Sequence, residues 1–273
     1  MQRTVSTSPE STCCNRGMEN ADAVRFTLLG GGTPVDEDEL YRLYSYPAEL
    51  TRCVVRGNMI ASLDGAATND GISGGLGGAG DRWLFAVQRE LADVIVVGAG
   101  TARTENYGGA RLSVAQRRRR QALGQSEVPP IALVTRTGLI ERDMAVLTGS
   151  ELLPLVLTCA ASVGIARDRV GVAAEVVDCS GADPHQVDLT VLVERLAQRG
   201  LLRVLTEGGP SLLGGFVAAT LLDELCLTSA PLLLGGNAVR IATGETGSLT
   251  RMRRAHVLTD EDGYLYARYA RIR

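Results

Sequence analysis

Short apolar runs that alternate with helical segments are the dominant pattern of this chain. Six runs have the length and aliphatic content of buried strands: Arg52–Ser62, Val94–Val97, Ile131–Thr135, Leu155–Thr158, Glu175–Val177 and Leu202–Leu205. Helical patterns occupy much of the chain around them, at Val35–Tyr46, Asp81–Ala92, Ser113–Leu123, Leu189–Arg199 and Leu212–Ala219. This alternation predicts an α/β fold with a mostly parallel central sheet that is covered by helices on both faces.

The two ends of the chain predict different structures. Residues 1–20 are polar and without periodicity, which is typical of a flexible tail. Residues 21–273 are expected to form a single domain, in which 21–50 is an N-terminal extension with a helix. At the other end, His256–Thr259 and Tyr264–Ile272 flank Asp262-Gly263 and predict an antiparallel hairpin at an edge of the sheet.

Composition excludes several classes of function. A net charge of -3 and 4% aromatic residues give no basis for nucleic-acid binding, and no apolar run is long enough to span a bilayer. The sequence contains no lysine, which excludes a Schiff-base lysine and a phosphate-loop lysine. Neither His185 nor His256 has a partner at triad or metal-ligand spacing, and no cysteine belongs to a C-x-x-C pair. We therefore expect a cytoplasmic protein with reduced thiols and no metal site.

Three turns at strand ends carry the candidate chemistry: Ser62–Gly65, Gly98–Thr101 and Thr206–Ser211. Paired glycines before a helix let the backbone approach a phosphate, and the unpaired amides of the first helical turn then point at it. Glu207 places a carboxylate beside that cradle. Because the carboxyl ends of parallel strands meet at one edge, the three turns should converge on a single crevice. Each turn taken alone is also compatible with an ordinary strand-to-helix connection.

Together these segments resemble the pyrimidine reductase family of riboflavin biosynthesis, which has a dihydrofolate-reductase-like fold. The matching stretches are Asn58–Thr68, Leu91–Tyr107, Ile131–Gly138 and Leu201–Gly236. The zinc motif of the deaminase half found in bifunctional relatives is absent from the sequence. The resemblance implies an NADPH-dependent reductase, usually a homodimer. Its substrate would be a pyrimidine nucleotide, 5-amino-6-(5-phosphoribosylamino)uracil, whose ribosylamino group becomes a ribitylamino group.

The resemblance also assigns expected roles to individual residues. Asp64 and Glu207 are the catalytic candidates. The cofactor would be bound by Ala61, Gly98, Gly100, Thr101, Thr135, Arg136, Gly208, Gly209, Pro210, Ser211, Leu212 and Leu213. The substrate would be bound by Asn58, Ser62, Arg89, Arg103, Glu105 and Arg111. Arg136 would contact the adenosine 2′-phosphate and so favour NADPH over NADH. Plainer readings also exist: an Asp-Gly turn at Asp64, an exposed turn arginine at Arg136 and a solvated helix arginine at Arg89.

The substrate half departs from the family pattern. Many relatives have lysine at the position of Asn58, and Asp-Asp-Pro at the position of Glu105-Asn106-Tyr107. Relatives often carry a tryptophan in the loop that here reads Gly74–Gly77. These differences leave two rival functions open, reduction of a dihydropterin and NADPH binding without turnover. The apolar run Leu225–Leu234 has two interpretations of its own, a buried core strand, which we favour, or a contact of the dimer that the resemblance implies.

Overall fold

The computed structural model describes residues 24–244 and 247–272, so the tail expected at residues 1–20 lies outside the described residues. The strands are β1 (Phe26–Leu28), β2 (Thr33–Val35), β3 (Val54–Ala61), β4 (Val94–Gly98), β5 (Ile131–Val134), β6 (Leu155–Thr158), β7 (Glu175–Asp178), β8 (Arg203–Thr206), β9 (Leu222–Ser229), β10 (Met252–Thr259) and β11 (Leu265–Arg271). The helices are α1 (Glu37–Tyr44), α2 (Ala79–Leu91), α3 (Ala99–Thr104), α4 (Val114–Ala122), α5 (Ala145–Thr148), the short η2 (Ala160–Ser162), α6 (Val163–Val170), α7 (Leu189–Ala197) and α8 (Pro210–Ala218).

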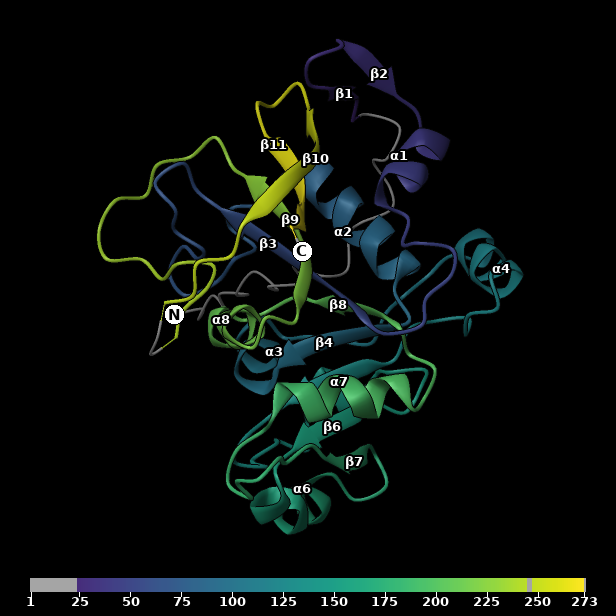
Figure 1. Ribbon diagram of the computed structural model, residues 1–273, viewed down its shortest axis with the longest axis vertical. Coiled ribbons are helices and arrows are strands. Elements are labelled where there is room, and N and C mark those ends of the chain that lie inside the picture. The colour runs from purple at the N-terminus through teal and green to yellow at the C-terminus, as the bar shows by residue number, and fades with distance from the viewer. Residues whose placement is uncertain (1–23, 245–246, 273) are drawn as a thin grey trace, which may run out of the picture.

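One 11-stranded sheet runs through the described residues in the order β2-β1-β10-β11-β9-β3-β8-β4-β5-β6-β7. Every pairing from β9 to β7 is parallel, and every pairing from β2 to β9 is antiparallel. In Figure 1 the antiparallel strands lie in the upper part of the molecule and β6 and β7 lie near its lower end. The prediction of a mostly parallel sheet flanked by helices is therefore confirmed.

Helices cover both faces of the parallel half, because β4 is apolar on both sides. Val94 and Val96 pack on one face with residues of α7 and α8. Ile95 and Val97 pack on the other face with residues of α3 and α6. All four side chains are fully buried. A continuous apolar run is thus a correct signal for a strand that is buried on both sides.

The antiparallel half differs from the sequence expectation. The hairpin of β10 and β11 is confirmed, with Gly263 in the positive-φ conformation that its turn requires (φ 85°), but this hairpin does not form the edge. Instead β1 pairs with β10, and β2 is the last strand. The predicted N-terminal extension is therefore part of the sheet. The sequence did not indicate β1 and β2, because each has three residues, which is too few to show a period-two pattern, and β2 contains Pro34.

The run Leu225–Leu234 divides into two parts. Its first half belongs to β9, which is paired on both sides with β3 and β11. Cys226 and Thr228 are buried there, whereas Leu225 and Leu227 are half-buried, so the favoured buried-strand interpretation holds for one face of the strand. Its second half leaves the sheet, and Leu233 is 77% exposed. Within the described residues, no helix combines the length and the apolar character that crossing a membrane would require.

The arginine-rich helix α4 is largely exposed but buries one of its arginines. Ser113 and Gln116 form a capping box at its start, as the residue types allow. Arg120 is 1% exposed and donates to the carbonyl oxygens of Glu90 and Ala92, at distances of 2.5 and 2.6 Å. It thereby satisfies carbonyl groups at the end of α2, which a helix leaves unpaired. This arginine is structural.

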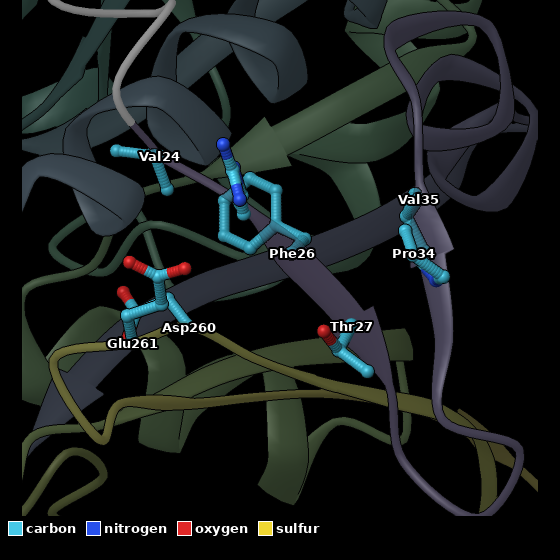
Figure 2. Close-up of a pocket in the computed structure, with 8 residues that line it drawn as sticks. Val24, Phe26, Thr27, Pro34, Val35, Asp260 and Glu261 are labelled. Atoms are coloured by element: carbon cyan, nitrogen blue, oxygen red, sulfur yellow. The ribbon is translucent and has the colours of Figure 1, made fainter.

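A hollow of about 250 Å³ lies between the β1–β2 hairpin and the turn that follows β10. Figure 2 shows its lining, with Asp260 and Glu261 on one side, Pro34 and Val35 of β2 on the other, and Phe26 and Thr27 of β1 between them. It is at the antiparallel end of the sheet, several strands away from β8, β4 and β5. It does not include any of the residues predicted to bind a ligand.

Candidate active site

The predicted turns lie at one edge of the sheet because β3, β8, β4 and β5 are parallel neighbours. Two of the turns touch directly. The Gly98 amide donates to the Gly208 carbonyl oxygen at 2.8 Å, and the Glu207 amide donates to the Val96 carbonyl oxygen at 3.0 Å. Strand β3 contacts the turn after β8 as well, since the Met59 sulfur would lie 3.2 Å from a Cβ at Gly208. The structure thus joins two of the three predicted turns directly, and the third follows a strand that is paired with β8.

Glycine is required where the turns after β4 and β8 meet. A Cβ atom on Gly209 would lie 2.3 Å from the Thr101 hydroxyl oxygen, which is closer than non-bonded atoms approach. Gly208 has φ 80°, a conformation that side chains disfavour. Gly100, by contrast, is exposed, and a Cβ there would meet nothing within 4 Å. The structure therefore gives a steric reason for the glycines of the β8 turn but not for Gly100.

Helix α8 begins without a side-chain cap. Gly209 is its N-cap residue and Pro210 is its first residue, so the amides of Ser211 and Leu212 have no side chain that accepts from them. Ser211 is exposed at this end. Leu213 fits its predicted cofactor role poorly, because its amide donates to the Gly209 carbonyl oxygen at 3.0 Å and its side chain is buried in the core.

Thr135 and Arg136 follow β5 at the same edge. The Thr135 side chain is buried and its hydroxyl oxygen accepts from the Gly138 amide at 3.2 Å, which orders the turn. The Arg136 carbonyl oxygen accepts from the Ser162 hydroxyl at 2.7 Å, so the backbone there is fixed. Its guanidinium is exposed, and no hydrogen bond or ion pair joins it to another residue of the described chain. A cation on a fixed backbone beside the turns is suited to an anionic ligand.

Arg89 and Glu207, which were assigned separate roles, form a bidentate pair. The Arg89 Nε and Nη2 atoms each donate to a Glu207 carboxylate oxygen at 2.7 Å. The Glu207 side chain is 1% exposed and that of Arg89 is 10% exposed. Phe85 and Tyr107 flank the guanidinium, with ring centres 4.2 and 5.3 Å from its central carbon. The pair is therefore a rigid polar unit in an aromatic setting, and sequence reasoning missed both rings.

Asp64 has a different environment from the one expected of an acid catalyst. Its carboxylate accepts hydrogen bonds from the Ser62 hydroxyl and from the amides of Leu234 and Gly235. These hydrogen bonds, that from Ser62 most of all, lower the pKa of Asp64 to about 2. The side chain is therefore ionised at neutral pH and is a poor proton donor there. The structure argues against proton delivery by Asp64.

The remaining predicted substrate residues are divided between loop contacts and the surface. The Glu105 carboxylate accepts from the Ser73 amide at 2.7 Å and so fixes the glycine-rich loop after β3. Arg103 pairs with Glu141 at 2.8 Å, while Arg111 is exposed. Ser62 and Asn58 complete the set: Ser62 directly follows β3, and Asn58 lies within that strand.

Asn58 pairs with a residue that sequence analysis did not select. Its Oδ1 atom accepts from the Gln88 Nε2 atom at 3.0 Å, and Gln88 is 2% exposed. The Gln88 Oε1 atom has no hydrogen-bond partner among the described residues, and a side-chain acceptor buried in this way is costly. Ala61, at the end of the same strand, uses its carbonyl oxygen to accept from the Ala230 amide at 2.8 Å.

Neither histidine lies among these residues. His256 is buried beside Tyr44, with ring centres 5.0 Å apart, and burial lowers its pKa to about 4. His185 is exposed. In the described part of the chain, no group of three His, Cys, Asp or Glu residues is placed to hold a metal ion.

Known proteins are similar to this chain in sequence and in fold. The chain is 31% identical over 241 residues to the riboflavin biosynthesis protein RibD of Bacillus amyloliquefaciens, covering 87% of this chain and 62% of that protein. It therefore spans less than two thirds of that relative's length. It is 27% identical over 192 residues to the 2,5-diamino-6-ribosylamino-4(3H)-pyrimidinone 5′-phosphate reductase of Archaeoglobus fulgidus, covering 69% of this chain and 85% of that one.

A solved structure and a family model agree with these relatives. A pyrimidine reductase-like protein from Corynebacterium diphtheriae superposes with a TM-score of 0.70 at 27% identity, covering 81% of this chain and 92% of that one. This likeness confirms the dihydrofolate-reductase-like fold that the sequence resemblance implied. The model of the RibD C-terminal domain matches residues 54–266, which include all of the strand-end turns. The chain belongs to the RibD C-terminal domain family.

Proposed function

We propose that this protein is an NADPH-dependent reductase of the riboflavin pathway. Its substrate is 5-amino-6-(5-phosphoribosylamino)uracil or the closely related diaminopyrimidinone phosphate, and the product carries a ribitylamino group. Support comes from the family and from the activity after which the archaeal relative is named. We also propose a homodimer, which analytical ultracentrifugation can test.

One observation carries the proposal. The turn after β4 packs closely on the turn after β8, so that a Cβ on Gly209 would collide with the Thr101 hydroxyl group. Helix α8 begins at this contact without a side-chain cap. Uncapped amides at a helix start favour a phosphate group. Arg136 supplies a cation on the adjacent strand end. Such a combination fits a dinucleotide that has a pyrophosphate and an additional 2′-phosphate.

The residues of this chain have distinct tasks in the proposed reaction. Gly208 to Ser211 bind the pyrophosphate through the backbone, and a bound nicotinamide supplies the hydride. Glu207, held in one orientation by Arg89, accepts hydrogen bonds from hydroxyl or amino groups of the substrate, because a carboxylate has about four acceptor positions. The proton that completes the reduction comes from Glu207 or from water.

One observation favours a second substrate. Asn58 and Gln88 form a neutral amide pair where many relatives place a lysine. Amide groups offer a donor and an acceptor side by side, which matches the edge of a pterin ring as well as that of a pyrimidine. Reduction of a dihydropterin is therefore the alternative activity.

The test is oxidation of NADPH, followed by the absorbance of the reduced nicotinamide, with the phosphoribosylaminopyrimidine and dihydrofolate assayed in parallel. Turnover of the pyrimidine is the expected result. Turnover of dihydrofolate alone would assign the alternative activity. Binding of NADPH without turnover of either compound would contradict the catalytic proposal and support a binding protein.

Arg136 provides a separate test of cofactor choice. Arg136→Ala is expected to raise the KM for NADPH about tenfold or more, with little change for NADH, because charge-assisted hydrogen bonds to the 2′-phosphate contribute about 1.5–3 kcal/mol. Steady-state kinetics with both cofactors measure this. Arg118→Ala, at an exposed arginine on α4, is the matched control. Equal losses for NADPH and NADH would show that Arg136 does not contact the 2′-phosphate.

A further inference from the structure

The connection from β9 to β10 begins with residues 231–243, which form no helix or strand in the structure. In Figure 1 this connection loops outward from the end of β9, beside the turn that follows β3, and returns near α8. Most of the segment is exposed, including Leu233 and Arg240. Its course is nevertheless defined, since it is attached to the rest of the protein at two places.

The first attachment is to Asp64 and its turn. The Asp64 carboxylate accepts from the Gly235 amide at 2.6 Å and from the Leu234 amide at 3.3 Å. Two backbone hydrogen bonds flank this contact: the Leu63 amide donates to the Leu232 carbonyl oxygen at 2.8 Å, and the Ala67 amide donates to that of Val239 at 2.8 Å. The segment thus curls around a single carboxylate.

The second attachment is to the first turns of α8. The Thr243 amide donates to the Pro210 carbonyl oxygen at 3.0 Å, and the Thr243 and Ser211 hydroxyl groups are 3.4 Å apart. A Cβ on Gly214 would lie 1.9 Å from the Thr243 carbonyl oxygen, so glycine is required for this contact. Ala242 packs against the hydrophobic core beneath. The segment therefore runs from the Asp64 turn to the start of α8.

We propose that residues 231–243 form one wall of the dinucleotide site and that Asp64 is the positioning residue that holds this wall in place. The inference rests on the proposed binding of NADPH at α8. In this inference Asp64 acts by holding residues 231–243 in place and not by transferring a proton. A carboxylate whose oxygens accept a hydroxyl group and two backbone amides is fitted to fix a loop. The low pKa of Asp64, about 2, keeps this acceptor ionised at every pH of practical interest.

Limited trypsin digestion tests the proposal without requiring turnover. The readout is the appearance of a new N-terminus at Ile241, measured by mass spectrometry, because Arg240 is the exposed cleavage site within the segment. Asp64→Asn keeps the size of the side chain and removes its charge. We expect cleavage after Arg240 in the cofactor-free variant to be about tenfold faster than in the wild type, since cleavage follows the population of the released segment.

The second part of the experiment measures the effect of NADPH on cleavage and the KM for NADPH. We expect NADPH to slow cleavage of the wild type, and Asp64→Asn to raise the KM for NADPH about tenfold while kcat changes less than about twofold. Asp70→Asn is the matched control: Asp70 is exposed and has φ 51°, which asparagine tolerates, so cleavage and KM should equal those of the wild type. Circular dichroism confirms that each variant is folded.

The outcomes separate the two proposals. Unchanged cleavage in Asp64→Asn, together with a loss confined to kcat, would show that Asp64 acts in the chemistry, and the positioning role would be overturned. If the wild type binds NADPH but the cofactor does not slow cleavage, the segment is not a wall of the site. If cleavage accelerates in Asp64→Asn but the wild type does not bind NADPH, the proposed function fails, and with it the assignment of the segment to a dinucleotide site.

Discussion

Two buried arginine–carboxylate clusters lie in this sheet, and they have different environments. At the strand ends, Glu207 accepts two hydrogen bonds from Arg89. Where the antiparallel and parallel parts of the sheet meet, Glu224 of β9 accepts from Arg56 of β3 at 2.7 Å and from Arg268 of β11 at 2.6 Å. Burial by itself would raise the pKa of Glu224, but the two guanidinium groups outweigh it and the pKa is lowered.

The surroundings of the second cluster identify it as structural. Arg56 also donates to the Tyr44 carbonyl oxygen at 2.6 Å, and Arg268 donates to that of Leu43 at 2.5 Å. The cluster therefore ties β3, β9, β11 and the end of α1 together. Glu207, in contrast, directly follows its strand and precedes the glycine turn. A buried charge alone does not indicate a functional site, whereas a buried charge at the carboxyl end of a parallel strand makes its residue a candidate for one.

The largest expected effect comes from removing the two carboxylates in turn. Glu224→Gln leaves the buried Arg56 and the half-buried Arg268 without a counter-charge and should lower the free energy of unfolding by about 3–5 kcal/mol, measured by urea denaturation. Its folded fraction, assayed at low temperature, should keep the wild-type KM for the pyrimidine. Glu207→Gln should lose stability as well, but should also raise that KM. Equal KM values in the two variants would remove the functional distinction between the clusters.

A smaller effect is expected at the turn contact. Gly209→Ala places a Cβ against Thr101 and should weaken NADPH binding about 100-fold, equivalent to about 2.7 kcal/mol, as measured by fluorescence titration. The control is Gly164→Ala in α6, where a Cβ would meet nothing within 4 Å. The double variant with Thr101→Ala should recover part of the affinity. If it recovers none, Thr101 itself contacts the cofactor.

The smallest effect concerns His256, beside the structural cluster. Burial, and then Arg268 and Arg56, lower its pKa to about 4, whereas an unfolded histidine titrates near 6.5. The unfolded chain therefore binds a proton first as the pH falls, and the protein should lose about 2 kcal/mol of stability between about pH 6.5 and 4. His256→Phe should flatten the pH dependence of the melting temperature in that interval. If the melting temperature of His256→Phe depends on pH as that of the wild type does, ionisable groups other than His256 cause the dependence.

The sequence allowed the parallel half and its glycine turns to be predicted, because these features are local. The segment Val94–Val97 is apolar at every position and so indicates a buried strand. Gly208-Gly209 precede a helical pattern and so indicate a turn at a helix start. The pair of Arg89 and Glu207 was not predictable as a pair, since 118 positions separate the two residues. The same limit applies to Asp64, whose Asp-Gly turn was recognised but whose contacts with Leu234 and Gly235 are about 170 positions away.

The two outermost strands have a consequence for how the protein associates. β2 has three residues, one of them Pro34, and β7 has four, with exposed Glu175 and Asp178 at its ends. A strand that is short and interrupted by proline, or bordered by charges, is a poor template for a further strand. The open edges of this sheet are therefore protected against strand-by-strand aggregation. Copies of the chain that assemble in an ordered way should meet through a face of the molecule and not by extending the sheet.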